Sequence, residues 1–329
     1  MDLAFFRKLL SIDSTSGRER TVAEWLFDSV DAPARERFEV GDGTLNLLFS
    51  WGTPKVVFCS HMDTVPPYIA PSFEGGVVRG RGSCDAKGQI VSMLEACRRL
   101  SDSGADGFGL LLLSGEETGS WGAKAFARTG FQAPFLIIGE PTENRMVSAA
   151  KGTKSFDLVF HGKAFHSGYP GNGVSAVDLF NRFYNDLKAK DFGIDPELGE
   201  TTWNIGLLKS DNPQNILSPE LTCRLYFRTT FVSDEAVQSH MATAGDGLTV
   251  IPRGGDEPAR YVTLDGFPSG PVAFGSDAPH LTNFGHKIIC GPGSINHAHR
   301  DDEHILVADM ETAVDQYIMM FKALTGWSR

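Results

Sequence analysis

The chain has 329 residues, of which 41% are hydrophobic and 22% charged, and its formal net charge at pH 7 is −11. This composition is typical of a globular chain long enough for about two domains. The acidic balance argues against a nucleic-acid partner, because phosphate binding draws on clustered lysine and arginine side chains. No segment approaches the roughly 20 apolar residues of a membrane span, so we expect no membrane partner.

The N-terminal stretch carries charged residues within an apolar run, namely Asp2, Arg7 and Lys8. It lacks the small-residue cleavage site of a signal peptide, so it predicts an amphipathic helix. The chain has five cysteines, an odd number, and contains no C-x-x-C pair. These features favour reduced thiols in a cytoplasmic protein.

Four short apolar runs end abruptly, as strands buried on both faces of a sheet do. In chain order they are KVVFCS (55–60), LLLLS (110–114), FLIIG (135–139) and KIIC (287–290). Apolar residues also repeat at helical spacing, within 22–30, 90–100 and 314–324. The alternation predicts an α/β fold in which helices flank a mostly parallel sheet.

The segment between the third and fourth runs differs in character. Its patterns predict, in order, a strand, a helix, two strands, a helix and a strand, at 155–162, 173–189, 201–209, 220–230, 233–243 and 247–252. We therefore expect an inserted α+β domain at 152–263. The remaining segments, 1–151 and 264–329, would form one discontinuous domain.

Side chains of the types that bind metals follow the ends of all four core strands. In chain order they are His61 with Asp63, the adjacent Glu116 and Glu117, Glu140, and finally His297 and His299. In an open α/β sheet, groups at the carboxyl ends of parallel strands converge on one crevice. A single polar residue after a strand is usually just the start of a loop. Four strand ends that all carry metal-binding residue types, however, favour a metal site.

A fifth contributor is Asp85, in the stretch GRGSCDAKGQ that precedes the helical pattern at 90–100. Asp is also a common helix N-cap, and the residue after Lys87 is not the Ser or Thr of a phosphate-binding loop. With the histidines and glutamates, however, Asp85 completes a mixed nitrogen and oxygen donor set suited to a pair of zinc or similar divalent ions. Its two oxygens could bridge both ions.

The motifs SHMDTVP, GRGSCDAKG, SGEETGS, IIGEPT and GPGSINHAHRDDEHI resemble a known family in order and spacing. This family comprises the di-zinc deacylases and exopeptidases that include acetylornithine deacetylase, succinyl-diaminopimelate desuccinylase, aminoacylase and glutamate carboxypeptidase. The resemblance spans nearly the whole chain, and the motifs look most like those of acetylornithine deacetylase, which implies a role in arginine biosynthesis. It also implies two divalent ions, zinc foremost, with cobalt and manganese as alternatives.

The resemblance assigns a ligand role to five matching residues. It implies that His61, Asp85 and Glu140 bind one or both ions, with Asp85 bridging them, and that Glu117 and His299 bind the other. His297 matches no ligand position of the family and is interpreted as a loop residue.

The same resemblance makes Glu116 the general base beside the ligand Glu117. Neighbouring side chains on an extended segment point to opposite sides, so we expect Glu117 to face an ion while Glu116 accepts a proton from the attacking water. Asp63 is expected to hydrogen-bond to His61 and set its tautomer. Asp63 could instead simply cap a loop.

The resemblance implies that 152–263 is a lid or dimerisation domain and that 1–151 with 264–329 is the catalytic, metal-binding domain. In the inserted domain, AFHSGYP resembles the family segment whose histidine, here His166, reaches the active site of the partner subunit in a homodimer. Asn215 and Arg228 match residues that hold the substrate carboxylate. Alternatively, Asn215 caps a turn and Arg228 is an ordinary edge-strand cation. The family usually has an acidic residue two positions before this arginine, where the present chain has Tyr226.

Two glycines in the last motif, Gly291 and Gly293, are expected to let the backbone approach the substrate, although a tight turn alone would also explain them. The favoured function is hydrolysis of the amide bond of an N-acyl amino acid, of the acetylornithine, acetylcitrulline or acetyllysine type. The alternative is a dipeptidase or carboxypeptidase, and Glu140 fits both, because within the family a glutamate there goes with deacylases and carboxypeptidases. A non-catalytic metal-binding interaction protein would have lost the base or a ligand, and none is lost. The absence of a G-x-S-x-G elbow argues against a serine hydrolase.

Overall fold

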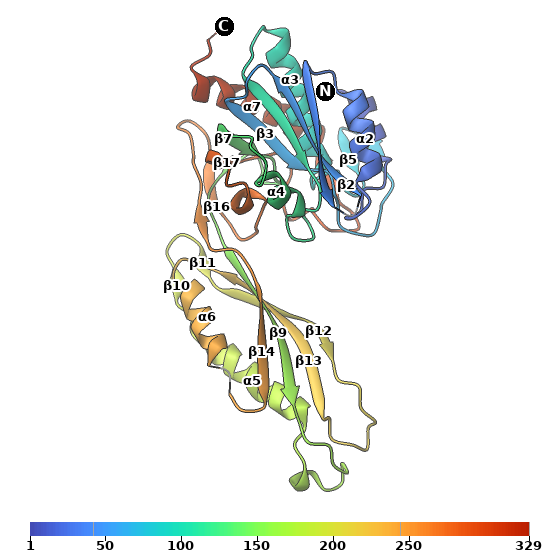
Figure 1. Cartoon of the computed structure of the whole chain (residues 1–329), viewed down its shortest axis with the longest axis vertical. Coiled ribbons are helices and arrows are strands. Elements are labelled where there is room, and N and C mark those ends of the chain that lie inside the picture. Colours follow the sequence, from blue (N-terminus) through green and yellow to red (C-terminus); the bar gives the residue numbers. More distant parts are fainter. Residues whose placement is uncertain (42, 244, 329) are drawn as a thin grey trace. The chain divides into compact units, whose positions relative to one another are not determined.

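The computed structural model describes residues 1–41, 43–243 and 245–328 and is shown in Figure 1. Contacts divide the chain into two compact units. The core unit comprises Met1–Ser148, Tyr261–Gly270 and Ser276–Arg329, and the inserted unit comprises Ala149–Arg260 and Pro271–Gly275. Compared with the expected boundaries at 152 and 263, the inserted unit begins and ends three residues earlier, and it gains the short stretch 271–275.

The core unit is built on a six-stranded sheet with the order β1-β2-β6-β3-β7-β17. The strands are β1 (Ala34–Gly41), β2 (Thr44–Trp51), β3 (Val56–His61), β6 (Phe108–Leu113), β7 (Ala133–Ile138) and β17 (Phe284–Ile289). The four strands from β6 to β17 are mutually parallel, whereas β1 and β2 pair antiparallel at one edge. The prediction of a mostly parallel sheet is thus confirmed, while the edge hairpin was not anticipated because β1 is largely exposed and lacks an apolar run.

Within the described residues the core unit has five α-helices. They are α1 (Leu3–Leu10), α2 (Arg20–Ser29), α3 (Lys87–Asp102), α4 (Trp121–Phe126) and α7 (Val307–Thr325). Four of these helices contact the sheet, while α1 contacts α3. Helices α3 and α7 pack against each other and against β3, whereas α2 contacts β2 and α4 contacts β1. Of the apolar positions predicted for α3, Ile90, Met93, Cys97 and Leu100 are buried, and Leu94 is partly buried. The helical periodicity therefore identified the face that packs on the sheet.

Short strands form two further three-stranded sheets. One has the order β18-β5-β4 and consists of β4 (Ser72–Glu74), β5 (Val77–Arg79) and β18 (His304–Leu306). The other consists of β8 (Met146–Ala150), β15 (Ala259–Arg260) and β16 (Ser269–Val272). The pairing of β18 with β5 brings the end of the last long loop beside the segment that leads to α3.

The inserted unit has its own sheet, with the order β12-β13-β9-β14 and antiparallel pairing throughout. Its elements are β9 (Gly152–His161), α5 (Ala176–Ala189), β10 (Ile194–Asp195), β11 (Gly199–Glu200), β12 (Thr202–Lys209), β13 (Glu220–Thr229), α6 (Asp234–Ala242) and β14 (Leu248–Gly254). Burial alternates along β13, as expected for a sheet with one covered face. Side chains from the sheet and from both α5 and α6 form a separate apolar core.

Within the part of the chain that the structure describes, no helix has the length and apolar character needed to cross a membrane. All five cysteines are buried and unpaired, so none forms a disulfide bond.

The packing of β3 on α7 generates a stability prediction. The fully buried ring of Phe58 lies 5.7 Å from that of Tyr317, measured between ring centroids. We expect Phe58→Ala to lower the free energy of unfolding by about 3 to 5 kcal/mol, because it removes buried contacts and leaves a cavity. Chemical denaturation followed by circular dichroism measures the change. Met319→Ala, at an exposed position of the same helix, is the control and should change the value by no more than about 0.5 kcal/mol. Equal effects of the two substitutions would contradict the packing described.

Candidate functional site

The metal-ligand types predicted from the sequence lie at the carboxyl edge of the core sheet. His61 is the last residue of β3, Glu116 and Glu117 follow β6, Glu140 follows β7, and His299 lies in the loop after β17. Asp85 stands two residues before the first residue of α3. All of these residues belong to the core unit. The fold therefore gathers them from separate stretches of the sequence, as the strand-end argument requires.

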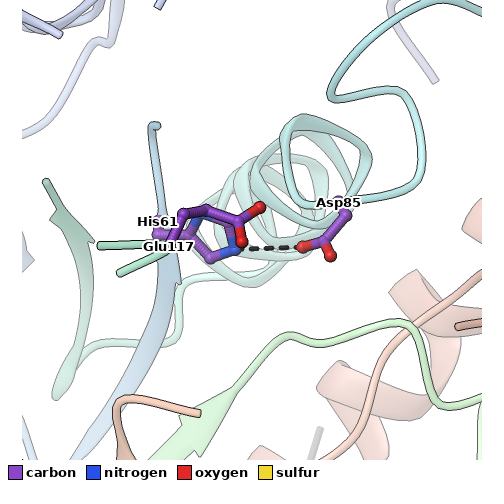
Figure 2. Close-up of side chains that lie close together, drawn as sticks. All are labelled: His61, Asp85 and Glu117. Carbon is purple, nitrogen blue, oxygen red and sulfur yellow. Dashed lines mark hydrogen bonds and ion pairs between the residues drawn. The ribbon is translucent and has the colours of Figure 1, made fainter. Parts of the chain in front are cut away.

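Three of these side chains form the tightest cluster. One ligand atom from each of His61, Asp85 and Glu117 lies within 4.8 Å of the other two. Figure 2 shows the imidazole of His61 pointing at the carboxylate of Asp85, with Glu117 beside it. Among the described residues, no other group of three histidine, cysteine or acidic side chains meets this spacing.

The carboxylate of Asp85 lies between two imidazoles. Its Oδ1 is 3.0 Å from Nε2 of His61, and its Oδ2 is 3.3 Å from Nε2 of His299. The same nitrogen of His299 is 3.0 Å from Oε1 of Glu117. His61 and Asp85 are buried, whereas about half of the His299 side chain is exposed. Each oxygen of Asp85 thus faces a different nitrogen donor, which is the arrangement of a carboxylate that can bridge two ions.

Asp63 has a wider structural role than the sequence suggested. The nearest partner of His61 Nδ1 is the backbone carbonyl oxygen of Asp63 at 3.0 Å, and the carboxylate Oδ1 is 3.4 Å away. That carboxylate accepts hydrogen bonds from the backbone amides of Glu116 and Glu117, at 3.0 and 3.2 Å, and from the hydroxyl of Ser16 at 2.8 Å. Asp63 therefore orients the two glutamates as well as His61.

Glu116 and Glu117 lie in a turn after β6, not on an extended segment. The amides of Gly119 and Ser120 both donate to the carbonyl oxygen of Glu116 and close this turn. The expectation that the two side chains alternate as on a strand is consequently wrong, because β6 already ends at Leu113. One contact distinguishes the pair: Oε1 of Glu117 lies 3.0 Å from Nε2 of His299. The charge of His61 affects the pKa of both glutamates.

Crowding of acidic groups governs the electrostatics of the site. Burial raises the pKa of Glu116 and of Glu140 well above the ordinary value, and the negative charges of their neighbours add to this. Burial also raises the pKa of Glu117. Hydrogen bonds to Asp85 and Glu117 raise the pKa of His299 to about 10. A cation at the centre of such a group offsets the repulsion and keeps the carboxylates ionised.

The residues present fit divalent metal ions. Two donors about 2.1 Å from one ion, at a tetrahedral angle, lie about 3.4 Å apart, close to the 3.0 and 3.3 Å that separate Asp85 from its two imidazoles. The donor set of imidazole nitrogens and carboxylate oxygens is one that zinc and similar ions accept. The chemistry of the site therefore agrees with a pair of ions held around Asp85.

Sequence reasoning missed Asp277, which is buried close enough to Glu116 and Glu140 to raise the pKa of each. Burial raises the pKa of Asp277 itself to about 6. Its Oδ1 is buried and, among the described residues, has no hydrogen-bond partner. Asp277 precedes the short 3-10 turn Ala278–His280, so it does not follow a strand and the strand-end criterion could not find it.

Also missed were Arg81 and Glu303, a buried ion pair beside Asp85. Both residues fall inside the quoted motifs, GRGSCDAKG and GPGSINHAHRDDEHI. The signal was therefore present, but a charged residue without a known role in a motif gives no reason to single it out.

The two predicted glycines pack against the ligand-bearing segments. A Cβ on Gly291 would meet the backbone oxygen of Glu140 at 2.6 Å, and one on Gly293, where φ is +79°, would meet Cys84 Sγ at 2.7 Å. Close approach of the Glu140 backbone favours glycine at 291, whereas at 293 the positive φ and the Cys84 side chain favour it. His297 lies outside the metal cluster and stacks on His304 with ring centroids 4.1 Å apart.

The remaining predicted residues lie in the inserted unit. His166 is exposed, pairs with Ile216 through an isolated bridge, and accepts a hydrogen bond at Nδ1 from the amide of Gly168. The amide of Ser167 donates to the carbonyl oxygen of Asn215, so these two segments lie side by side. The segments of His166 and Asn215 follow β9 and precede β13, at the end of the sheet where His161 pairs with Glu220.

Arg228 lies near the opposite end of β13, paired with Thr153 and Thr202. Because β13 is an inner strand of its sheet, the interpretation of Arg228 as an edge-strand cation is wrong. Its guanidinium lies 5.0 Å from the ring centroid of Tyr226. The strand from Glu220 to Arg228 spans about 27 Å at roughly 3.4 Å per residue, so a single inserted unit cannot bring Asn215 and Arg228 to one carboxylate.

Comparison with known proteins agrees with this geometry. Residues 57–323 match the family model described as Peptidase family M20/M25/M40. A Peptidase M20 domain-containing protein of Schizosaccharomyces pombe is 30% identical, and the match covers 99% of this chain and 83% of the relative. A probable carboxypeptidase of Aspergillus terreus is 31% identical over 98% of this chain and 86% of its own length.

Two solved structures share the fold. A tripeptidase from Staphylococcus aureus superposes with a TM-score of 0.83 at 20% identity, and the match covers 99% of this chain and 98% of that one. An M20 family metallo-carboxypeptidase from Sulfolobus solfataricus gives a TM-score of 0.75 at 16% identity, with 98% and 99% covered. With a family match over most of the chain and relatives aligned over nearly all of it, the protein belongs to peptidase family M20/M25/M40 and is a hydrolase.

Proposed function

We propose that this protein cleaves the amide bond of an N-acyl amino acid with the aid of two divalent metal ions. The main support for this proposal is the position of Asp85, whose two oxygens face His61 and His299. Glu117 contacts the same His299. In this proposal His61, Asp85 and Glu140 hold one ion, and Asp85, Glu117 and His299 hold the other. Zinc suits this donor set best.

When bound, the ions supply Lewis acidity and lower the pKa of an attacking water to about 7. Glu116 is the proposed general base, because it sits in the same turn as Glu117 and Asp63 holds both of their amides. Its carboxylate accepts a proton from the attacking water and delivers it to the departing amine nitrogen. Asp63 keeps His61 and this turn in place through the contacts described above.

The amine-side product of this reaction is an amino acid with a free carboxylate, for which Arg228 is the proposed partner. A second candidate, release of an amino acid from a dipeptide or longer peptide, uses the same residues. It is favoured by the curated relatives that are named probable carboxypeptidases. The two candidates differ in the acyl group, which is a small acid in one case and an aminoacyl residue in the other.

A hydrolysis panel tests the substrate class. N-acetyl and N-succinyl derivatives of ornithine, citrulline, lysine and diaminopimelate would be compared with simple dipeptides, each as the free acid and as the C-terminal amide. We expect the N-acyl free acids to be cleaved fastest, and the amides to react about 10- to 100-fold more slowly, because a hydrogen bond to a charged group is worth about 1.5 to 3 kcal/mol.

Arg228→Gln should abolish that preference for the free acid. Arg224→Gln is the matched control, because Arg224 lies on the same strand and is paired with Asp157. Faster cleavage of dipeptides than of every N-acyl amino acid would favour the second candidate. Equal rates for acids and amides in the unmodified protein would contradict the proposed role of the carboxylate in both candidates.

The roles of the adjacent glutamates form a separate prediction. Glu116→Gln should retain the metal content of the unmodified protein while turnover falls by about two to four orders of magnitude, the usual contribution of a positioned acid-base group. Glu117→Gln should lose metal, because it removes a carboxylate that contacts His299. Metal analysis after dialysis, together with steady-state kinetics, separates the cases. If Glu116→Gln loses metal and Glu117→Gln keeps it, the two roles are reversed.

We further propose that two inserted units pair in a homodimer, so that His166 of one chain serves the site of the other. Within one inserted unit Asn215 and Arg228 are about a strand length apart, so holding one carboxylate between them requires two copies. Strand β12 is an edge of its sheet, and it exposes Leu207 and Leu208. An edge strand with exposed apolar side chains is suited to pairing with a second copy.

Mixing inactive variants tests this assembly. His166→Ala and Glu116→Gln chains, each inactive alone, should regain part of the activity after subunit exchange, because one site of the heterodimer would combine an intact base with an intact partner histidine. A mixture of Glu116→Gln and Glu117→Gln is the control and should stay inactive, since neither chain carries an intact core site. Sedimentation would establish that dimers form and exchange. A fully active monomer, or proven exchange without recovery, would refute the contribution from the partner.

A further inference from the structure

Arg81 and Glu303 form a fully enclosed ion pair behind the candidate metal centre. Nη1 of Arg81 donates to Oε2 of Glu303 over 2.6 Å, and both side chains are at most 2% exposed. The two residues are distant in sequence, and they meet because β18 pairs with β5. The pair belongs to neither the proposed ligands nor the proposed base.

The hydrogen bonds of this pair lead directly to two proposed metal ligands. Oε1 of Glu303 accepts from the backbone amides of Cys84 and Asp85, at 3.0 and 3.1 Å. Arg81 Nη1 also donates to the carbonyl oxygen of Arg300, the residue after His299, at 3.1 Å. One side of the pair therefore holds the Asp85 segment, and the other side holds the His299 segment.

The ion pair is not what brings these segments together, so its role lies in fixing their relative position. Backbone pairing of β18 with β5 already brings them together, and the amide of Gly80 donates to the carbonyl oxygen of Glu303 at 3.0 Å. Burying two charges is costly, and a buried ion pair is often no more stabilising than apolar residues of similar volume. Stability alone is thus a weak reason for placing a charged pair here.

A second buried carboxylate of the site, that of Asp63, makes the same pattern of hydrogen bonds as Glu303. Asp63 accepts hydrogen bonds from two successive amides, those of Glu116 and Glu117, just as Glu303 accepts from those of Cys84 and Asp85. In both cases a buried carboxylate fixes the backbone at a ligand-bearing turn, so that the ligand side chain starts from a defined position.

We propose that Arg81 and Glu303 are positioning residues that fix the bridging carboxylate of Asp85 against His299. This inference rests on the proposed metal centre. Loss of the pair would let the two segments move relative to each other, which changes the 3.3 Å separation between Asp85 Oδ2 and His299 Nε2. The consequence is weaker metal binding, because groups that orient ligands typically contribute a factor of about 10 to 100 in metal affinity.

Glu303→Gln tests the pair with little change of shape. The amide oxygen can still accept from the amides of Cys84 and Asp85, but its NH₂ group faces the donor of Arg81, so the link between the two segments is broken. We expect zinc affinity, measured by competition with a chromophoric chelator, to fall about 10- to 100-fold while circular dichroism reports a folded protein. The visible absorption of the cobalt-loaded protein should also change, because it reports ligand geometry.

Glu95→Gln is the matched control. Glu95 is a buried glutamate of α3 that bonds to Arg98 and Arg99, and its loss should lower stability without changing metal affinity or the cobalt spectrum. Arg81→Lys keeps the charge but cannot reach Pro67, Arg300 and Glu303 together as the guanidinium does. It should show an intermediate loss of affinity.

The outcomes separate this inference from the proposed function. If the unmodified protein binds no metal, the metal centre itself is refuted and the positioning role falls with it. If it binds metal and folded Glu303→Gln binds with unchanged affinity and spectrum, only the positioning role is refuted. If Glu303→Gln does not fold, Arg81→Lys decides: unchanged metal affinity in a folded Arg81→Lys protein overturns the proposal, and reduced affinity supports it.

Discussion

The carboxylate of Asp85, held between the imidazoles of His61 and His299, is the contact on which the architecture of the site depends. Around it the core sheet concentrates further acidic groups at the ends of its parallel strands, where burial raises their pKa values. Such a cluster is unfavourable by itself, because like charges in a poorly solvated place repel one another. Divalent cations turn the same arrangement into a favourable one. The site therefore fits metal chemistry through its charge as much as through its spacing.

Several buried polar residues support the segments of the proposed ligands. Asp63 and Glu303 each accept hydrogen bonds from two consecutive backbone amides of a turn that carries a proposed ligand. Glycines at 291 and 293 allow the last loop to pack against the segments of Glu140 and Cys84, where any side chain would collide. These contacts fix the backbone from which the proposed ligand side chains start. In the proposed metal centre they would act as the outer hydrogen bonds that orient metal ligands.

The two units divide the proposed work between them. The core unit contains every proposed metal ligand and the proposed base, whereas the inserted unit contains the three residues proposed to meet the substrate or the partner site. In the inserted unit, His166 and Asn215 lie on neighbouring segments, and Arg228 lies near the other end of β13. This separation follows from the extended geometry of a strand. It makes association of two chains part of the proposed function and not only a matter of stability.

The amino-acid sequence is enough to predict the α/β class, the parallel core strands and the side chains at their ends, because buried parallel strands are continuous apolar runs and their carboxyl ends share one edge. It also located the longer helices and strands of the inserted domain to within a few residues, but not the short strands β10 and β11. The backbone conformation at Glu116 and Glu117 could not be predicted in this way, since their turn is held by the distant Asp63 and not by strand geometry. Likewise, the contacts of Asp277, Arg81 and Glu303 are made with residues that are distant in the sequence, so no local pattern predicts them. Local patterns record which residues are buried and where strands end, but hydrogen bonds between remote segments leave no periodic trace in the sequence.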